Sequence, residues 1–340
     1  MCHAQIEYHE RSFMKILITG TSGFIGFHLA KRLLDEEHDI LGVDNFCDYY
    51  DVRLKEARNA ILEKDPRFRL ARADISDGKV LAKVFASFCP DVVVNLAAQA
   101  GVRYSIEHPE VYATTNITGF LNVLECCRHA PTPPRLLYAS SSSVYGGLKE
   151  MPFREDMRVD TPISLYAASK KSNELMAHCY SHLYGLQTIG LRFFSVYGPW
   201  GRPDMAAWLF ASAMKDGRPI KVFNYGNMRR DFTYIDDIVD GVVRCINHIA
   251  ALPQCDVFNI GNHRPERLLD MIEIIAREMG FASMDEVKME MLPMQDGDIP
   301  ASFASIDKLN KAVGYVPATP ISVGMPKFVA WYRKWAGIDK

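Results

Sequence analysis

Tyr166 and Lys170 stand four positions apart, and this pair of side chains could move a proton. A free tyrosine is a poor base because its pKa is about 10. A neighbouring ammonium group favours the phenolate and moves the pKa of the phenol toward working pH. Residues i and i+4 of a helix lie on one face, so a helix here would bring the two groups together. The pair predicts an acid–base centre for a secondary alcohol that also loses hydride.

A second tyrosine–lysine pair, Tyr145 and Lys149, has the same spacing. Glycines lie between its members and oppose a helix, whereas residues 164–184 carry apolar side chains at helical spacing. We therefore expect the first pair, and not the second, to be catalytic. The apolar positions of the expected helix are Leu165, Ala168, Leu175, Cys179 and Leu183.

A run of four serines, Ser140 to Ser143, precedes the catalytic pair. The run follows an apolar stretch that reads as a strand, so its hydroxyls would gather at the carboxyl edge of a sheet. One such hydroxyl could assist the proton transfer. The alternative is a serine-rich turn whose hydroxyls bond their own backbone.

A glycine-rich turn follows the apolar run 16–18, with Gly20, Gly23 and Gly26 spaced by three. Gly20 can turn the chain off a strand, Gly23 lets the backbone approach a pyrophosphate, and Gly26 lets the next helix pack closely. The helix expected at about residues 24–34 would aim its N-terminal N–H groups at the phosphates. The turn predicts a dinucleotide cradle, although a plain strand–helix turn has a similar sequence.

Two aspartates follow the next expected strands. Asp44 lies 18 residues after Gly26, where a carboxylate can accept hydrogen bonds from both adenosine ribose hydroxyls. The same charge would repel a 2′-phosphate, which favours NAD over NADP. The alternative is that Asp44 caps the following turn. Asp74 could receive the adenine amino group or could equally be a turn residue.

The elements that must position these residues alternate along the chain. Short, continuous apolar runs alternate with longer helical stretches, which is typical of strands covered on both faces. The pattern predicts the α/β class, with a Rossmann-type doubly wound parallel sheet and a smaller C-terminal substrate-binding domain. In such sheets the ligand lies beyond the carboxyl ends of the strands, and each motif above follows an expected strand. The expected strands are residues 15–19, 40–44, 68–73, 91–96, 136–140 and 188–193.

The organisation of the chain changes near residue 194, where prolines and glycines begin to punctuate shorter elements. We expect residues 1–13 to be a polar, disordered leader, with Met14 as the natural start or the first ordered residue. Residues 14–193 would form the NAD-binding Rossmann domain, to which a strand near 257–260 could return. Residues 194–340 would mainly form the substrate-binding domain.

Composition excludes several classes of function. The 340 residues are 48% hydrophobic and carry a formal charge of −2, so no global positive field exists for nucleic acid or an acidic membrane. No apolar run reaches the roughly 18–20 residues of a membrane span, and residues 1–13 lack the apolar segment of a secretory signal. The eight cysteines show no metal-ligand spacing. We expect a cytoplasmic protein with reduced thiols, no metal, and no nucleic-acid or membrane partner.

With these motifs in this order, the chain resembles the extended short-chain dehydrogenase/reductase family, and within it the nucleotide-sugar uronate 4-epimerases. The resemblance runs from about Met14 to the C-terminus. It is carried further by residues 95–105 (NLAAQAGVRYS), 191–205 (LRFFSVYGPWGRPDM) and 230–234 (RDFTY). It implies reversible C4 epimerisation of UDP-glucuronate to UDP-galacturonate through a 4-keto sugar, with NAD retained and regenerated in each cycle.

The resemblance also implies site roles. Ser141 matches the catalytic serine or threonine, and Tyr166 and Lys170 match the acid–base pair, with Lys170 also holding the nicotinamide ribose. Arg230 matches an arginine on the UDP phosphates, and Asp298 a contact to the uridine ribose. The implied cofactor residues are Gly20, Gly23, Phe24, Ile25, Gly26, Asp44, Asn45, Asp74, Ile75, Leu96, Ala97, Ala98, Tyr166 and Lys170. The implied substrate residues are Ser141, Ser142, Ser143, Ser195, Arg202, Arg230, Asp298 and Arg103.

Related activities stay open as alternatives. Decarboxylases and dehydratases of this family carry a carboxylate where residues 141–143 are all serine, which opposes a UDP-glucuronate decarboxylase. Gln295 opposes a UDP-hexose 4-epimerase, since those enzymes usually place an arginine there. A non-catalytic NAD-binding regulator would have no use for the proton-transfer set.

The carboxylate of a uronate needs a partner of its own. A 4-keto uronate is a β-keto acid and loses CO₂ readily, so we expect Ser142, Ser143 and Arg202 to hold the carboxylate away from that geometry. The alternative for Arg202 is a phosphate or surface arginine, and Arg103 is a second candidate.

The resemblance further implies a homodimer, formed by the helix after residue 105 and the helix that carries Tyr166. Leu121, Leu124 and Ala168 could contribute to that interface. The same apolar positions would serve the core of a monomer equally well.

Overall fold

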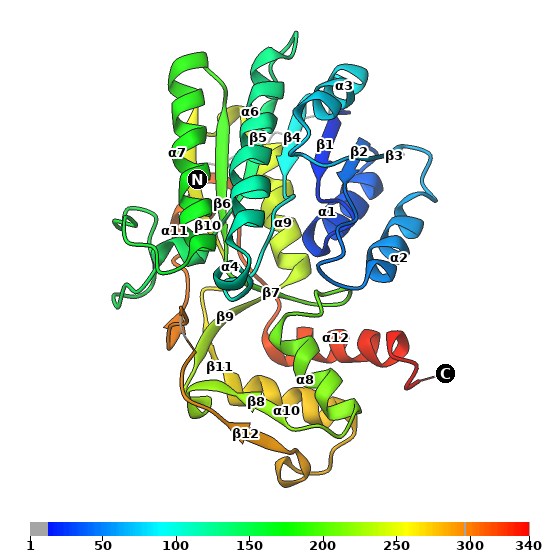
Figure 1. Ribbon diagram of the computed structural model, residues 1–340, viewed down its shortest axis with the longest axis vertical. Helices are drawn as coiled ribbons and strands as arrows, with labels where there is room; N and C mark the ends of the chain where they lie inside the picture. Colours follow the sequence, from blue (N-terminus) through cyan, green and yellow to red (C-terminus); the bar gives the residue numbers. More distant parts are fainter. Residues whose placement is uncertain (1–12, 296, 340) are drawn as a thin grey trace, which may run out of the picture.

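The computed structural model of the chain describes residues 13–295 and 297–339. The leader expected at residues 1–13 lies outside these residues except for Phe13, which is exposed. A seven-stranded sheet with parallel pairing throughout forms the centre of the upper part of the molecule (Figure 1). Its strand order is β10-β6-β5-β4-β1-β2-β3, so β1 and β4 lie side by side and connections run outward in both directions. The strands are β1 (Lys15–Thr19), β2 (Asp39–Asp44), β3 (Phe68–Arg72), β4 (Val92–Asn95), β5 (Arg135–Ser141), β6 (Thr188–Phe193) and β10 (Cys255–Ile260).

Helices cover both faces of this sheet, and the strand sequences explain why. Ile16 and Ile18 of β1 join one apolar core, whereas Leu17 between them joins the other. Alternate residues of a strand point to opposite faces, so a continuous apolar run buries both. The first core includes α1 (Phe24–Asp35) and α9 (Ile235–Asn247); the second includes α3 (Gly78–Phe88), α6 (Phe120–His129) and α7 (Leu165–Tyr184). The predicted doubly wound α/β fold is confirmed.

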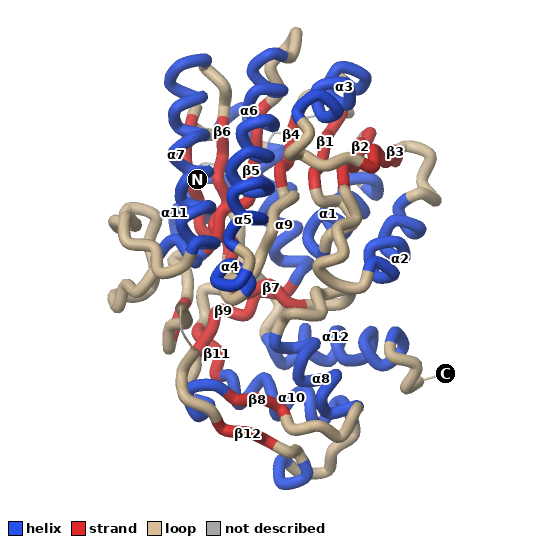
Figure 2. The backbone as a smooth tube through the Cα atoms, viewed as in Figure 1, coloured by secondary structure: helices blue, strands red, loops and turns tan. Residues whose placement is uncertain are grey.

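A smaller lobe lies beneath the sheet and is built from short strands and helices of the second half of the chain (Figure 2). Its strand β9 pairs with β7, β11 and β13, and β8 pairs with β12. The strands of the lobe are β7 (Ser195–Tyr197), β8 (Ile220–Val222), β9 (Arg229–Tyr234), β11 (Pro265–Arg267), β12 (Met289–Met291) and β13 (Ala301–Ser302). Its helices are α8 (Ala206–Lys215), α10 (Leu268–Met279) and α12 (Ile321–Trp335).

The chain passes between the two parts more than once. After β9 it returns to the sheet layer as α9, which packs against α1, and as β10, which pairs with β6. The later helix α11 (Asp307–Val313) contacts β10 and α9. Residues after 194 therefore belong partly to the sheet layer.

The long helix α7 carries the predicted catalytic pair, and its ends follow standard capping rules. Ser164 accepts a hydrogen bond from the N–H of Ala167 at the start, and Gly185 ends the helix in a left-handed conformation. The buried face consists of small and polar side chains, which are Ala167, Ser169, Lys170, Asn173, Glu174, Ala177 and Ser181. The apolar stripe read from the sequence does not face the sheet: Leu165, Leu175 and Leu183 are 42%, 57% and 65% exposed.

Candidate active site

A single cleft of about 1300 Å³ lies between the carboxyl ends of the sheet strands and the smaller lobe. Every residue predicted from the sequence to bind cofactor or substrate or to act in catalysis lines this cleft. The topology explains the convergence, because the loops after β1, β2, β3, β4, β5 and β6 all open at one edge of the sheet. In the described part of the chain, no group of His, Cys, Asp or Glu could hold a metal ion.

The glycine turn fits a dinucleotide. Gly20 has φ +77°, and a Cβ on Gly26 would lie 2.1 Å from the carbonyl oxygen of Gly20, so neither position admits a side chain. Gly23 precedes α1 as its N-cap and provides no side-chain cap, which leaves first-turn N–H groups free to meet an anion. Phe24 and Ile25 continue the turn and also line the cleft. The local geometry is that of a phosphate-binding strand–turn–helix.

Asp44 is fixed beside this turn at the end of β2. One carboxylate oxygen accepts from the N–H of Ser22 at 3.0 Å and the other from the N–H of Phe46 at 2.9 Å. Each oxygen keeps a further lone pair that could accept a ribose hydroxyl. Asp74 is more heavily engaged: it accepts from the backbone and hydroxyl of Ser76, and from the amide of Asn45 at 2.7 Å. The alternative reading of Asp74 as a turn residue thus has direct geometric support.

Tyr166 and Lys170 lie one helical turn apart near the start of α7, facing the carboxyl end of β5. Lys170 is buried and donates to the carbonyl oxygen of Ala139 at 2.8 Å; burial lowers the pKa of its ammonium group to about 8. Burial raises the pKa of the Tyr166 phenol, while the Ser141 hydroxyl and the Arg202 charge act in the opposite direction. Burial outweighs these two groups, so the pKa of the phenol lies above its usual value of about 10.

The serine run divides between structural and cleft-facing roles. Ser140 is buried and donates to Glu174 at 2.7 Å. Ser141 ends β5, accepts from the N–H of Ser143 at 3.2 Å and donates to the hydroxyl of Ser143 at 3.1 Å. It thereby caps the 3₁₀ turn η2 (Ser142–Tyr145), as the serine-turn alternative predicts, while still lining the cleft. Ser142 and Ser143 are partly exposed on the same wall.

Arginines from the second half of the chain also line the cleft, and the charge of Arg202 reaches the phenol of Tyr166. Arg202 donates to both carboxylate oxygens of Asp204, from Nε at 3.0 Å and from Nη2 at 2.5 Å. Tyr49 donates to the same carboxylate at 3.2 Å. Burial disfavours the Arg202 cation, but Asp204 outweighs this and the pKa of Arg202 lies above its usual value. This pairing uses one edge of the guanidinium and leaves the Nη1 edge for another acceptor.

A second arginine–aspartate pair lies on β9 and the loop before β13. Arg230 donates from Nη2 to Asp298 at 2.6 Å. Arg103 is exposed, lies over the ring of Phe223 at 5.1 Å from its centroid, and lowers the pKa of Arg230 after the larger effect of burial. Ser195 at the start of β7 lines the cleft near this group. Two cations and several neutral donors are thus available for an anionic substrate.

Sequence reasoning missed several residues that hold these side chains. Asp204 and Tyr49 orient Arg202, and Asn116 links Gln99 to Ser169 on α7 with hydrogen bonds of 2.8 and 3.0 Å. Asn116 lies in the π-helical turn η1 (Ala113–Gly119), a feature that often marks functional sites. Only Asp204 stood close enough to a predicted site residue to be found from the sequence.

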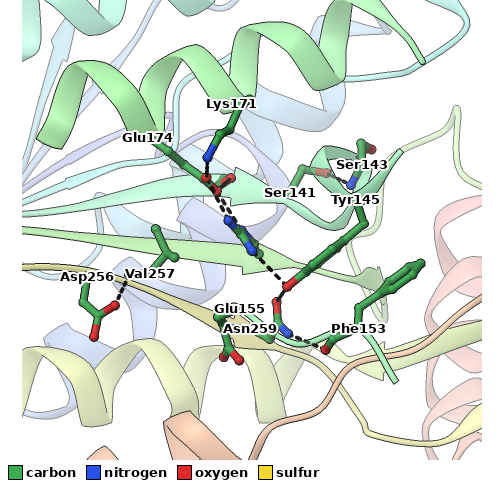
Figure 3. Close-up of polar contacts among 12 residues, drawn as sticks. Ser141, Ser143, Tyr145, Phe153, Glu155, Lys171, Glu174, Asp256, Val257 and Asn259 are labelled. Atoms are coloured by element: carbon green, nitrogen blue, oxygen red, sulfur yellow. Dashed lines mark hydrogen bonds and ion pairs between the residues drawn. The ribbon is translucent and has the colours of Figure 1, made fainter. Parts of the chain in front are cut away.

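A buried polar network connects α7, β6, η2 and β10 next to the cleft (Figure 3). Glu174 on α7 accepts two hydrogen bonds from Arg192 on β6, at 2.8 and 2.9 Å. Arg192 also donates to Tyr145, which donates to Asn259 on β10 at 2.7 Å. Tyr145 therefore has a structural environment, and burial raises the pKa of its phenol to about 12. The prediction that Tyr145 and Lys149 do not share a helix is confirmed, because the 3₁₀ turn η2 ends at Tyr145 and Lys149 lies beyond it.

Comparison with known proteins agrees with this geometry. The sequence model of the NAD dependent epimerase/dehydratase family matches residues 16–261. Protein CapI of Staphylococcus aureus is 48% identical over 95% of this chain and 99% of its own length. A probable UDP-glucuronate 4-epimerase of Rhizobium meliloti is 45% identical over 94% of this chain and 97% of its own length. The crystal structure of UDP-glucuronic acid 4-epimerase from Bacillus cereus, in complex with UDP-glucuronic acid and NAD, has a TM-score of 0.87 at 33% identity, over 95% of this chain and 100% of that chain. The chain belongs to the NAD-dependent epimerase/dehydratase family.

Proposed function

We propose that this protein is an NAD-dependent UDP-glucuronate 4-epimerase that interconverts UDP-glucuronate and UDP-galacturonate. The observation that carries the proposal is the meeting, in one cleft, of the glycine cradle, the Tyr166–Lys170 pair and the clamped guanidinium of Arg202. The likeness to the Rhizobium meliloti and Bacillus cereus proteins supports the same substrate. Positions 141–143 are serines where decarboxylases of this family carry a carboxylate, which supports an epimerase over a decarboxylase.

The cofactor would lie along the cradle, with the pyrophosphate at the start of α1 and the adenosine ribose at Asp44. Bound NAD supplies a hydride acceptor that is regenerated within each cycle. Its adenine end would lie near Asn45, Asp74 and Ile75, and the loop after β4 (Leu96, Ala97, Ala98) would line the path to the nicotinamide end.

In the proton transfer, Tyr166 takes the proton of the C4 hydroxyl when C4 is oxidised and returns it to the C4 oxygen when the keto group is reduced from the opposite face of the ring. The ammonium group of Lys170 favours the phenolate, and the Ser141 hydroxyl bonds both the phenol and the C4 oxygen. The sugar must present both faces of C4 in turn, so UDP has to stay bound while the ring rotates. Arg230, Asp298, Ser195 and Arg103, which all line the cleft, would hold UDP.

The carboxylate of the 4-keto sugar needs separate control, because its C–C bond breaks when that bond aligns with the carbonyl π system. Arg202 can hold the carboxylate through the edge that Asp204 leaves unused, while Ser142 and Ser143 donate from the opposite wall. Held near the ring plane, the carboxylate keeps its bond out of the alignment that releases CO₂.

Proton NMR of the purified protein with UDP-glucuronate and no added NAD tests the proposal. We expect a mixture of UDP-glucuronate and UDP-galacturonate without UDP-pentose, because the cofactor is retained. Tyr166→Phe should lower the rate by about 10²–10⁴-fold, as expected for loss of an acid–base group. Tyr145→Phe is the matched control and should stay active. Conversion of UDP-galactose alone, or pentose as the main product, would contradict the assignment.

We further propose a homodimer and a cytoplasmic location. Three leucines of α7 are exposed, and so is Leu121 of α6, the helix that α7 contacts; a second copy that packs on these two helices would cover them. Leu124 is fully buried and so contributes to the core of one chain. The seven cysteines in the described residues are free thiols, which suits a reducing compartment.

A further inference from the structure

Arg58 on α2 (Val52–Leu62) is a fully buried cation that the catalytic scheme leaves without a role. It lies at 0% exposure, and among residues 13–295 and 297–339 no carboxylate makes a hydrogen bond with it. Burying a charge without an ion pair costs free energy, which the hydrogen bonds of the buried group must offset. Its position between the cofactor cradle and the loop that carries Arg202 indicates what those bonds do.

The guanidinium of Arg58 joins two segments that are far apart in sequence. Nη1 donates to the carbonyl oxygen of Ser22 in the glycine turn at 2.8 Å and to the hydroxyl of Tyr50 at 2.8 Å. Nη2 donates to the carbonyl oxygens of Trp200 at 2.6 Å and Gly201 at 3.3 Å. The planar fork of arginine suits such a bridge, because donors on one rigid plane can satisfy several carbonyls.

The segment that Arg58 holds is strained. Trp200 adopts φ +60°, a left-handed conformation that is rare for a bulky L-residue and persists only where surrounding contacts impose it. Its ring packs against Phe27, Trp331 and Trp335 at centroid distances of 5.3 to 5.6 Å. His28 adds a second restraint by donating from Nε2 to the preceding carbonyl of Pro199 at 2.9 Å. The turn is thus fixed through both its side chain and its backbone.

This turn directly precedes Arg202, so the direction in which it leaves Gly201 sets where the guanidinium of Arg202 lies. We infer that Arg58 is a positioning residue which holds the Trp200–Gly201 turn, aims Arg202 at the substrate carboxylate, and so suppresses loss of CO₂ from the 4-keto sugar. The inference rests on the proposed function. It also links the two ends of the cleft, because Asp44 bonds Ser22, Ser22 bonds Arg58, and Arg58 bonds the turn before Arg202.

The test compares wild-type protein with Arg58→Met, Arg58→Lys and Arg202→Met, and with the Arg58→Met/Arg202→Met double variant. Proton NMR measures UDP-pentose formed relative to UDP-galacturonate. Arg58→Met should raise this ratio on the order of tenfold or more, since small misplacements of a positioning group have effects of that size. Arg58→Lys, with one donor centre, should give a smaller rise. In the double variant the ratio should equal that of Arg202→Met alone, because Arg58 acts through Arg202.

Leu62→Ala is the matched control, since it weakens the same helix without touching the turn. It should lower the midpoint of thermal unfolding and leave the product ratio at the wild-type value. An unchanged ratio in folded Arg58→Met, or in Arg58→Lys if the Met variant does not fold, would overturn the inference. A ratio in the double variant above that of Arg202→Met would overturn it too. Wild-type protein that converts no UDP-glucuronate would instead refute the proposed function.

Discussion

Single residues in this cleft have a proposed chemical role and also hold the surrounding backbone. Lys170 is buried, has a depressed pKa and also bonds a strand carbonyl. Asp44 faces the cleft, yet its two oxygens also fix the backbone of Ser22 and Phe46. Substitutions at such residues therefore change both binding and local geometry, and a useful variant keeps the size of the side chain while changing its charge.

Asp44→Asn is expected to weaken NAD retention by about tenfold to a hundredfold. The reason is the loss of charge-assisted hydrogen bonds, which contribute about 1.5–3 kcal/mol each. The measurement is the NAD released by denaturation per mole of purified protein, followed by titration of the stripped protein. Asp77→Asn, at the N-cap of α3 and outside the cleft lining, is the charge-matched control and should keep NAD retention near the wild-type value. Equal retention in wild type and Asp44→Asn would remove Asp44 from the cofactor site.

At the scale of elements, the cleft wall is held by bonds between segments far apart in the sequence. Glu174 on α7, Arg192 on β6 and Asn259 on β10 belong to one network, and Ser140 ties the end of β5 to it. Burial pushes the pKa of Glu174 up, but Arg192 outweighs this and the pKa lies below its usual value. The ionised Glu174–Arg192 pair is therefore the form that stabilises the folded protein.

Glu174→Gln should lower the free energy of unfolding by about 3–5 kcal/mol at pH 7, because it leaves Arg192 buried at 2% exposure without a counter-charge. A carboxyl group whose pKa is lower in the folded state stabilises the fold at pH values above the unfolded pKa of about 4.3. This stabilisation is lost as the pH falls through the folded pKa. The difference from wild type in denaturant unfolding should therefore shrink below about pH 4.

Glu56→Gln provides the surface comparison for this experiment. Glu56 pairs with Arg72 where both side chains are about half exposed, so its loss should cost no more than about 1 kcal/mol. A Glu174→Gln variant no less stable than Glu56→Gln would mean that the buried pair contributes little.

At the scale of the whole molecule, the sheet and the smaller lobe are joined by repeated crossings of the chain. β7 leaves the sheet, α9 and β10 return to it, and α10 leaves again. The two walls of the cleft are thus tied together by several segments as well as by Arg58. Helices α6 and α7, which contact each other in the upper part of the molecule (Figure 1), carry the exposed Leu121, Leu165, Leu175 and Leu183.

Leu175→Glu should convert the proposed homodimer to a monomer, because it places a charge in the apolar surface of α7. Size-exclusion chromatography with light scattering gives the mass directly. Val316→Glu, at an exposed position on another surface, should leave the mass unchanged. If wild-type protein is already monomeric at micromolar concentration, the dimer proposal is wrong.

The sequence alone predicted the elements and motifs whose signals are local. The six expected strands match β1 to β6 within two residues at either end, and the helix at residues 164–184 matches α7. These features depend on spacing within a few positions, such as continuous apolar runs, a glycine turn or an i, i+4 pair. The cofactor residues and the serine run were found for the same reason, since each follows its own strand and all strands of the sheet end at one edge. Substrate residues such as Arg230 and Asp298 came instead from the resemblance to a known family.

Only the tertiary structure decided which side chains hold one another. Arg58 meets Trp200, Tyr49 meets Asp204, and Tyr145 meets Asn259 across more than one hundred residues each. It also decided that the apolar stripe of α7 faces outward, whereas small and polar residues face the sheet. Periodicity reveals that a stripe exists but not what covers it, and long-range partners depend on the path of the chain. Local sequence thus fixed the elements and their reactive residues, and topology fixed the geometry in which those residues act.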